Sequence, residues 1–429
     1  MQWKNPLSAQ ANYEKLVAFL LFAALVTTTF NIRYVNSLSI ILLVMATLLH
    51  PRRLSLFKTA FSTPFFLACL ALLLWHLAGY LYSKHPDEEF SFISSKAGLV
   101  AIPFFFCANQ GITLPYRRTL TLVFGISLAI VSLICLFNAA WVYHQHGDPS
   151  VFFYHKLVSP FNHHAVLFSF FLLTCIIYWL EVDIPAAPGR KIKILLIILT
   201  LYFFLVTLLL SSKLVIVIML IYLTYYLVRN FSAYRNKKYI WQISLGLFIV
   251  LVMIIITNGP IKKRFTDLKG NMYLFEQQEF SPDIYFNGVQ FRLLNWRFTR
   301  EILDENHAWL LGVSPAGAQH ELNGKFIASN MYRGNGSTDK GYIGYNCHNQ
   351  FLQITLQSGI PGLFLFMLIF ALLIRQVLHS GRRETMIMVI AIIAFCFTES
   401  LLETQYGVEI FTFFPLMGLY ARDYRKLHS

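Results

Sequence analysis

The sequence has few charged residues: only 13% of its 429 residues are Asp, Glu, Lys or Arg, while 56% are hydrophobic. A soluble core cannot bury so much apolar surface, so this composition is typical of a chain whose solvent is mostly lipid. A formal net charge of +14 would favour nucleic-acid binding in a soluble protein. Here most Lys and Arg lie in short loops between apolar runs, so we attribute the excess to membrane topology and exclude nucleic acid as a partner.

Other absences narrow the function. The longest hydrophilic segment, residues 258–359, contains no Asp-x-Asp pair of the kind with which metal-dependent nucleotide-sugar transferases hold a diphosphate, and no glycine-rich phosphate loop faces the cytoplasm. Cationic side chains must then replace the metal, and we expect neither a metal nor a cofactor. The lack of an internal repeat weighs against a secondary transporter. Cys347 has no predicted partner outside the membrane, so we expect no disulfide.

Long apolar runs fill most of the chain. A membrane span needs about twenty residues, so the sequence predicts an all-α polytopic membrane protein with about twelve transmembrane helices. The predicted spans are residues 16–33, 35–49, 61–82, 92–108, 119–141, 161–181, 194–210, 214–228, 239–257, 360–378, 385–401 and 408–421. No small-x-small cleavage site follows the first run at Thr27 to Arg33, so we expect an uncleaved span rather than a signal peptide.

The cations alternate from loop to loop. If the N-terminus is cytoplasmic, the cations of the inside loops are Arg52, Arg53, Lys58, Arg117, Arg118, Arg190, Lys191, Lys193, Arg229, Arg235, Lys237, Lys238, Arg375, Arg382, Arg383, Arg422, Arg425 and Lys426. The short outside loops contain only Arg33, Lys84, Lys156 and Lys213. Because cytoplasmic loops are enriched in Lys and Arg, this alternation predicts that both termini are cytoplasmic.

The segment 258–359 is the exception to the pattern of short loops. It falls outside and is rich in Gly, Asn, Arg and Tyr, and long translocated segments escape the charge rule. Long loops are usually functional, so we expect two or more short helices there, packed on the outer face of the membrane. The predicted domains are 1–257 with nine spans, 258–359 as a catalytic loop, and 360–429 with three spans and a cytoplasmic tail.

The first candidate for chemistry is His348. The apolar residues Phe351, Leu352 and Leu356 predict a surface helix that ends at Gly359-Ile360-Pro361-Gly362, before the next span. We expect His348 in the first turn, where the helix dipole disfavours imidazolium and leaves a neutral imidazole able to accept a proton from a hydroxyl. The alternative is a capping or interfacial histidine that only hydrogen-bonds backbone.

The second candidate is the helical pattern from Phe291 to Leu303, on which Arg292, Asn295 and Thr299 share one face. An arginine at a membrane surface can bind a pyrophosphate bidentately and stabilise it as a leaving group. A solvated face or a contact with lipid headgroups is the alternative.

Weaker candidates lie elsewhere. Lys213 lies near the outer interface of the membrane, and Lys96 lies within an apolar run. Each side chain either extends to the membrane surface or faces a polar cavity. The paired histidines within 159–164 have no acidic neighbour, which disfavours a metal site. Glu399 and Glu403 are one turn apart near the outer end of a span, where a carboxylate can pair with a cation of the site or act as a second base.

The segment that starts at His348 resembles the O-antigen ligase and polymerase family of bacterial envelope enzymes, whose signature is His-Asn, apolar residues and then Gly-x-x-Gly leading into a span. The fitting residues are His348, Asn349, Phe351, Leu352, Leu356, Gly359 and Gly362. Arg292 and Trp296, followed by Leu311-Gly312-Val313, resemble the family's Arg-x-x-x-Trp and later Gly-Val stretch. With the long loop placed late in the chain, the resemblance extends over the second half.

This resemblance implies the fold of a multispan glycosyltransferase in the bacterial inner membrane with a periplasmic active site. It implies transfer of a glycan from undecaprenyl pyrophosphate to a hydroxyl of lipid A-core, within membrane lipid. The family's catalytic histidine falls on His348 and its loop arginine on Arg292. A second family arginine, in a Ser-Arg pair, falls on Lys213, and lysine keeps the charge but loses the planar fork.

The expected reaction is metal-independent and inverting. His348 deprotonates the acceptor, while Arg292 and Lys213, with Arg300 or Arg264, stabilise the departing pyrophosphate. The substrate-binding residues we expect beside these are Asn349 and Trp296. One alternative is a polymerase, whose acceptor is a second lipid-linked unit. Another is a polysaccharide transporter or flippase without catalysis, which should have ionisable residues along a central path rather than in the outer loop.

Overall fold

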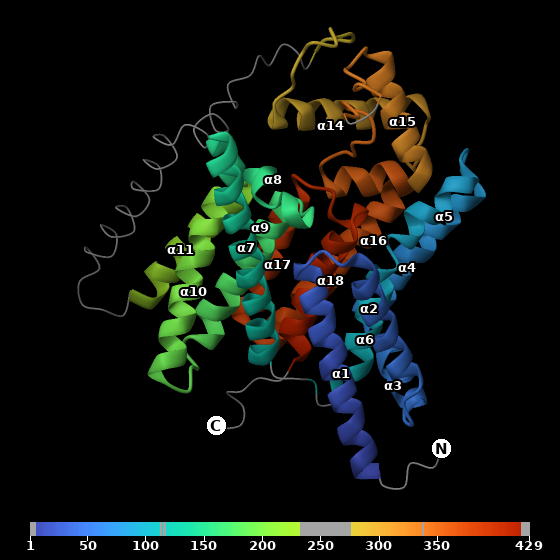
Figure 1. Ribbon diagram of the computed structural model, residues 1–429. Coiled ribbons are helices and arrows are strands. Elements are labelled where there is room, and N and C mark those ends of the chain that lie inside the picture. Colours follow the sequence, from blue (N-terminus) through green and yellow to red (C-terminus); the bar gives the residue numbers. More distant parts are fainter. Residues whose placement is uncertain (1–5, 112–113, 115–116, 232–275, 337–338, 422–429) are drawn as a thin grey trace. The chain divides into compact units, whose positions relative to one another are not determined.

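The computed structural model describes residues 6–111, 114, 117–231, 276–336 and 339–421. Every regular element it assigns in these ranges is a helix, which confirms the all-α class for the described part of the chain (Figure 1). The predicted span 239–257 and the candidate Arg264 lie outside the described residues.

The chain divides into two compact units. Unit 1 is Met1–Thr28, Ile32–Leu120 and Gly270–Ser429, and unit 2 is Thr29–Asn31 and Thr121–Lys269. The helices of unit 1 are α1 (Pro6–Thr29, except its last residue), α2 (Arg33–Leu48), α3 (Arg53–Phe61), α4 (Pro64–Ala78), η1 (Gly79–Leu81), α5 (Pro86–Ser94), α6 (Gly98–Ala108), η2 (Asn109–Gly111), α14 (Gly288–Glu305), α15 (Pro315–Ala328), α16 (Gln350–Ser380), α17 (Arg383–Cys396), η7 (Leu401–Glu403) and α18 (Gln405–Tyr420). Those of unit 2 are α7 (Arg117–His146, from Thr121 on), η3 (Pro149–Phe152), α8 (Tyr154–Leu157), η4 (Ser159–Phe161), α9 (Ala165–Tyr178), η5 (Trp179–Asp183), α10 (Arg190–Leu209) and α11 (Lys213–Phe231).

Many of the described helices are long and apolar enough to cross a membrane. By length and composition, eight qualify within the described residues: Gln10–Thr29, Pro64–Leu81, Pro86–Ala108, Arg117–His146, Ala165–Asp183, Arg190–Leu209, Lys213–Asn230 and Gln350–Ser380. The pair α2 and α3, bent by 112°, makes up to nine if it is one broken span. The polytopic membrane class is thus confirmed, whereas the number twelve is not.

Two of the predicted spans are short in the structure. The runs 385–401 and 408–421 correspond to α17 and α18, which have 14 and 16 residues. An upright helix of that length is shorter than the hydrocarbon core, because a span needs about twenty residues.

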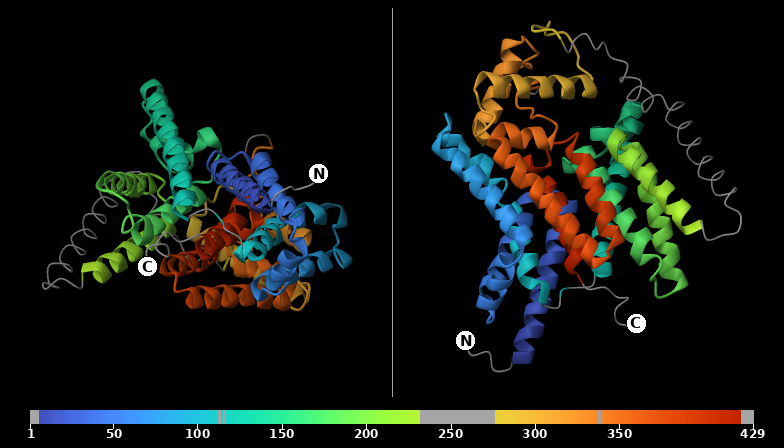
Figure 2. Two further views of the ribbon diagram at one scale, coloured as in Figure 1. Left: turned by 90° about the horizontal axis from the view of Figure 1, so that it is seen from below. Right: turned by 180° about the vertical axis from the view of Figure 1, so that it is seen from behind.

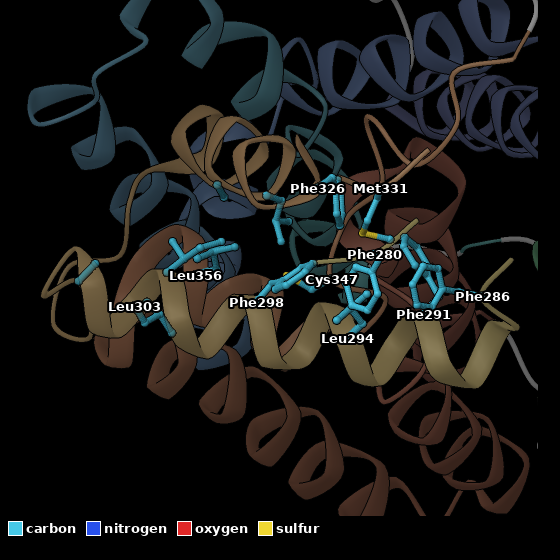
Figure 3. Close-up of a cluster of buried hydrophobic side chains, with 14 residues drawn as sticks. Phe280, Phe286, Phe291, Leu294, Phe298, Leu303, Phe326, Met331, Cys347 and Leu356 are labelled. Carbon is cyan, nitrogen blue, oxygen red and sulfur yellow. The ribbon is translucent and has the colours of Figure 1, made fainter. Parts of the chain in front are cut away.

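The predicted short helices of the segment 258–359 are α14 and α15. The side chain of Asn287 caps α14 and forms a capping box with Gln290, which fixes where the helix begins. The apolar face of α14 then packs against Leu322 and Phe326 of α15 (Figure 3). Figure 2 shows both helices beside the first half of α16, within unit 1.

The helix α16 bends at Gly359, as the sequence predicts. Gly359 has φ 64° and ψ −166°, a conformation that is almost restricted to glycine. The bend frees the carbonyl of Leu356, which accepts a hydrogen bond from Val313 N at 2.8 Å. The amide of Ile360 in turn donates to the carbonyl of Trp309 at 2.9 Å. The chain that joins α14 to α15 therefore inserts its backbone into the bend.

Two glycines permit this insertion. A Cβ on Gly359 would lie 2.2 Å from the carbonyl oxygen of Leu310, and one on Gly312 would lie 2.4 Å from Ser358 N. We call Gly312, Gly359 and the two backbone hydrogen bonds beside them the glycine latch. It fixes the α14–α15 hairpin relative to the helix that begins just after His348.

Candidate active site

His348 lies immediately before α16, not in its first turn, so the expected position was wrong. Asn349 is the N-cap, and its side-chain oxygen accepts from the amides of Phe351 and Leu352 at 3.0 and 3.2 Å. His348 has a left-handed backbone, φ 49°, and its amide donates to Asn346 Oδ1 at 3.0 Å. Because Asn349 is the cap, the helix begins at Gln350, two residues after His348.

A carboxylate contacts the imidazole instead. His348 Nδ1 lies 3.2 Å from Glu399 Oε2, and Arg292 Nη2 donates to Glu399 Oε1 at 2.7 Å. The three side chains are 18%, 15% and 28% exposed, so they are sheltered but reachable. The sequence prediction that His348 and Arg292 work together thus agrees with their sharing one carboxylate.

Arg292 is held by backbone as well. Its Nε donates to the carbonyl of Thr398 at 2.9 Å, and its Nη1 to the carbonyl of Gly288 at 2.8 Å. A guanidinium has five N–H groups, so three of them are used and two remain for a ligand. The fork is therefore oriented before any anion arrives.

The other residues of that face of α14 form the support beneath His348. Asn295 Nδ2 donates to the carbonyl of Asn346 at 3.0 Å, and Thr299 Oγ1 lies 3.2 Å from Cys347 Sγ. Asn295, Thr299 and Cys347 are buried. Burial raises the pKa of the Cys347 thiol to about 12, so this cysteine is a packing residue and not a nucleophile.

Aromatic side chains border the imidazole. The rings of Phe291 and Tyr345 lie 5.8 and 5.7 Å from the ring of His348. Trp296 is partly buried on α14, and its indole N–H has no hydrogen-bond partner in the described part of the chain. Trp296 stays a predicted substrate-binding residue, and its indole nitrogen is buried in this structure.

A second ion pair lies in the segment that carries Glu399. Lys96 is fully buried, and its Nζ lies 3.0 and 2.9 Å from the two carboxylate oxygens of Glu403. Gln357 Nε2 also donates to Glu403, at 3.1 Å, and Leu402 N donates to Gln350 Oε1 at 2.7 Å. Lys96 therefore faces an internal carboxylate rather than snorkelling to water.

Two further cationic candidates lie in the described part of the chain, Arg300 and Lys213. Arg300 is 78% exposed and its nearest acid is Asp304 on the same helix, at 3.6 Å. Lys213 is the first residue of α11, in unit 2, and directly follows the buried Ser211 and Ser212. The structure thus brings together Arg292 and His348 and does not bring Arg300 to them.

The histidines of 159–164 have structural contacts in unit 2. His163 is buried and its Nε2 lies 2.8 Å from the carbonyl of Thr29, while the ring of His164 lies 4.7 Å from that of His155. Within the described ranges, no three His, Cys, Asp or Glu side chains gather as a metal site would require.

Sequence reasoning identified Glu399 only as one of two acids able to pair with a cation of the site or to act as a second base. The signal was its place in an apolar run, where ionisable residues are rare and usually functional. Its two partners could not be identified from local patterns, because Arg292 and His348 belong to segments far from Glu399 in the sequence.

Fold and site together define a class: an all-α polytopic membrane protein in which Arg292 of the α14–α15 hairpin, Glu399 after α17 and His348 before α16 meet. Residues 195–367 match the family model described as O-Antigen ligase, which confirms the resemblance of this part of the chain to that family. No curated protein matches the chain significantly. The family implies a bacterial membrane glycosyltransferase of the ligase or polymerase type, with a lipid-linked glycan and a glycan acceptor as partners.

Proposed function

We propose that the protein is an O-antigen ligase of the bacterial inner membrane. It transfers a glycan from undecaprenyl pyrophosphate to a hydroxyl of lipid A-core. Both termini are cytoplasmic and the α14–α15 hairpin is periplasmic, in keeping with the alternation of Lys and Arg between the loops. In this arrangement the hairpin lines the active site at the outer leaflet.

One observation carries this proposal: an arginine and a histidine from distant parts of the chain meet on one carboxylate, 2.7 and 3.2 Å away. Glycosyl transfer from a diphosphate needs a base for the acceptor and fixed positive charge for the leaving group. His348 and Arg292 supply both groups side by side. Their partial exposure leaves them open to a lipid-linked substrate.

The proposed step is a single displacement. The acceptor oxygen forms a bond to the anomeric carbon as the bond from that carbon to the pyrophosphate oxygen breaks. The proton of the acceptor hydroxyl passes to His348, and the electron pair of the broken bond leaves with the pyrophosphate. One displacement inverts the anomeric centre.

Arg292 stabilises the developing pyrophosphate charge with its remaining N–H groups. Lys213 is the proposed second cation, in the place of a family arginine. Arg264, outside the described residues, stays a further candidate, whereas the exposed Arg300 with its Asp304 neighbour is a weaker one.

A deletion strain tests the function through its lipopolysaccharide. Bare core together with accumulated lipid-linked chain supports a ligase. Single repeats on the core would contradict the ligase and indicate a polymerase. Loss of periplasmic glycan would contradict both and indicate an exporter. A plasmid with the natural gene should restore capped lipopolysaccharide, and His348→Ala should not. His379→Ala, at an exposed histidine near the end of α16, is the matched control that should restore it.

A further inference from the structure

We propose that Glu399 is a positioning residue that fixes the tautomer of His348, so that Nε2 is the atom that takes the acceptor's proton. This inference rests on the proposed function. It assigns a role to a carboxylate that neither accepts the proton nor touches the leaving group, but holds the residues that do.

The assignment follows from the hydrogen-bond chemistry of the pair. Glu399 Oε2 lies 3.2 Å from His348 Nδ1. An ionised carboxylate only accepts hydrogen bonds, and a neutral imidazole has a single N–H, so the hydrogen of His348 must be on Nδ1. The lone pair is then on Nε2, which has no hydrogen-bond partner within the described part of the chain.

Both oxygens of Glu399 are required at once. While Oε2 accepts from His348, Oε1 accepts from Arg292 Nη2 at 2.7 Å. Glutamine has the same shape but only one acceptor atom, because its other terminal group is an NH₂ donor. A guanidinium can only donate, whereas an imidazole nitrogen can donate or accept, so the single amide oxygen of Glu399→Gln stays on Arg292. Its NH₂ group then faces Nδ1 and moves the imidazole hydrogen to Nε2.

The backbone around Glu399 is anchored on both sides. Its amide donates to the carbonyl of Phe395 at 3.0 Å, and the preceding residue, Thr398, accepts from Arg292 Nε. Four residues on, Glu403 is held by the buried Lys96. The carboxylate consequently has little freedom to leave the imidazole, which is the rigidity that an orienting residue needs.

The role in the reaction follows. When the acceptor's proton reaches Nε2, the imidazole becomes an imidazolium, and the adjacent carboxylate stabilises that new charge. Glu399 keeps its own negative charge throughout. The same carboxylate keeps Arg292 beside the base, so that proton acceptance and stabilisation of the leaving group occur at neighbouring positions.

Steady-state transfer by the purified full chain, with an undecaprenyl-pyrophosphate glycan as donor and lipid A-core as acceptor, tests this role. Glu399→Gln should lower kcat by about 100-fold, the scale of general-base catalysis, without raising KM for the donor. Arg292→Ala should raise the donor KM. Glu399→Asp, which keeps two acceptor oxygens, should recover part of kcat. Glu321→Gln is the matched control and should be unaffected, because among the described residues Glu321 has a single ion pair, a 3.8 Å contact with the exposed Lys84.

Unchanged kcat in Glu399→Gln would overturn the inference, as would a donor KM that rises in step with the fall in kcat. If the natural protein itself transfers nothing, the proposed function fails instead. A second measurement does not depend on the folding of any Glu399 variant. The nitrogen-15 spectrum of histidine-labelled natural protein, compared with His348→Ala, should assign to His348 a protonated Nδ1 and an unprotonated Nε2, and the opposite tautomer would refute the proposal.

Discussion

Replacing Gly359 by alanine tests how the α14–α15 hairpin is held on α16. An L-residue at φ 64° and ψ −166° costs about 1–3 kcal/mol in backbone strain. The new Cβ would lie 2.2 Å from the carbonyl oxygen of Leu310, so the inserted chain must move away. That movement breaks the two backbone hydrogen bonds of the glycine latch, at about 1 kcal/mol each. The expected loss of stability is therefore about 3–5 kcal/mol.

Thermal unfolding of the purified protein in detergent measures this loss. Gly344→Ala is the control, because Gly344 also has a positive φ, 88°, but nothing lies within 4 Å of an added Cβ. The difference between the two variants isolates the contact with the inserted chain. We expect Gly359→Ala to lower Tm by at least about twice as much as Gly344→Ala. Equal losses would refute the proposal that close backbone contact at Gly359 holds the hairpin.

Three further predictions concern residues around the site. Lys96→Met leaves Glu403 without its buried cation and should lower the free energy of unfolding by about 3 kcal/mol. Adding Glu403→Gln should recover part of this loss in the same melting assay. A double variant no more stable than Lys96→Met alone would contradict this. Asn349→Ala should cost about 1 kcal/mol by removing the cap of α16, whereas Asn349→Asp, which also accepts from the two amides, should melt close to the natural protein. Burial raises the pKa of the Cys347 thiol to about 12, so a maleimide should label this cysteine at neutral pH only after the chain unfolds. Mass spectrometry measures the labelling, and rapid labelling of the folded chain would show that Cys347 is not buried.

Local sequence patterns predicted the parts of the site that local interactions determine. The apolar spacing of α14, the short helix after His348 and the bend at Gly359 all follow from side-chain period and glycine conformation. The face shared by Arg292, Asn295 and Thr299 was predicted from the same period. Asn295 and Thr299 contact the segment before α16, while Arg292 contacts Thr398.

Local sequence patterns could not predict the contacts between segments that are distant in the sequence. Nothing local to Glu399 shows that its carboxylate meets both Arg292 and His348, since those contacts depend on how α14 and α16 pack. His348 was predicted in the first turn of the helix, but it lies before the helix because the following residue, Asn349, is the N-cap. The apolar run 385–401 continues past the end of α17 at Cys396 into turns, so hydropathy alone overstated the length of that helix, whereas α18 begins earlier than the predicted run 408–421.

The central claim is that His348 acts as the base of a glycosyl transfer that needs no metal. The most direct test is the initial rate of transfer by purified protein from an undecaprenyl-pyrophosphate glycan to lipid A-core, measured with a chelator present. The account predicts undiminished turnover by the natural protein and a loss of at least about 100-fold in His348→Ala. Near-normal turnover by His348→Ala, or abolition of the natural activity by the chelator, would contradict it.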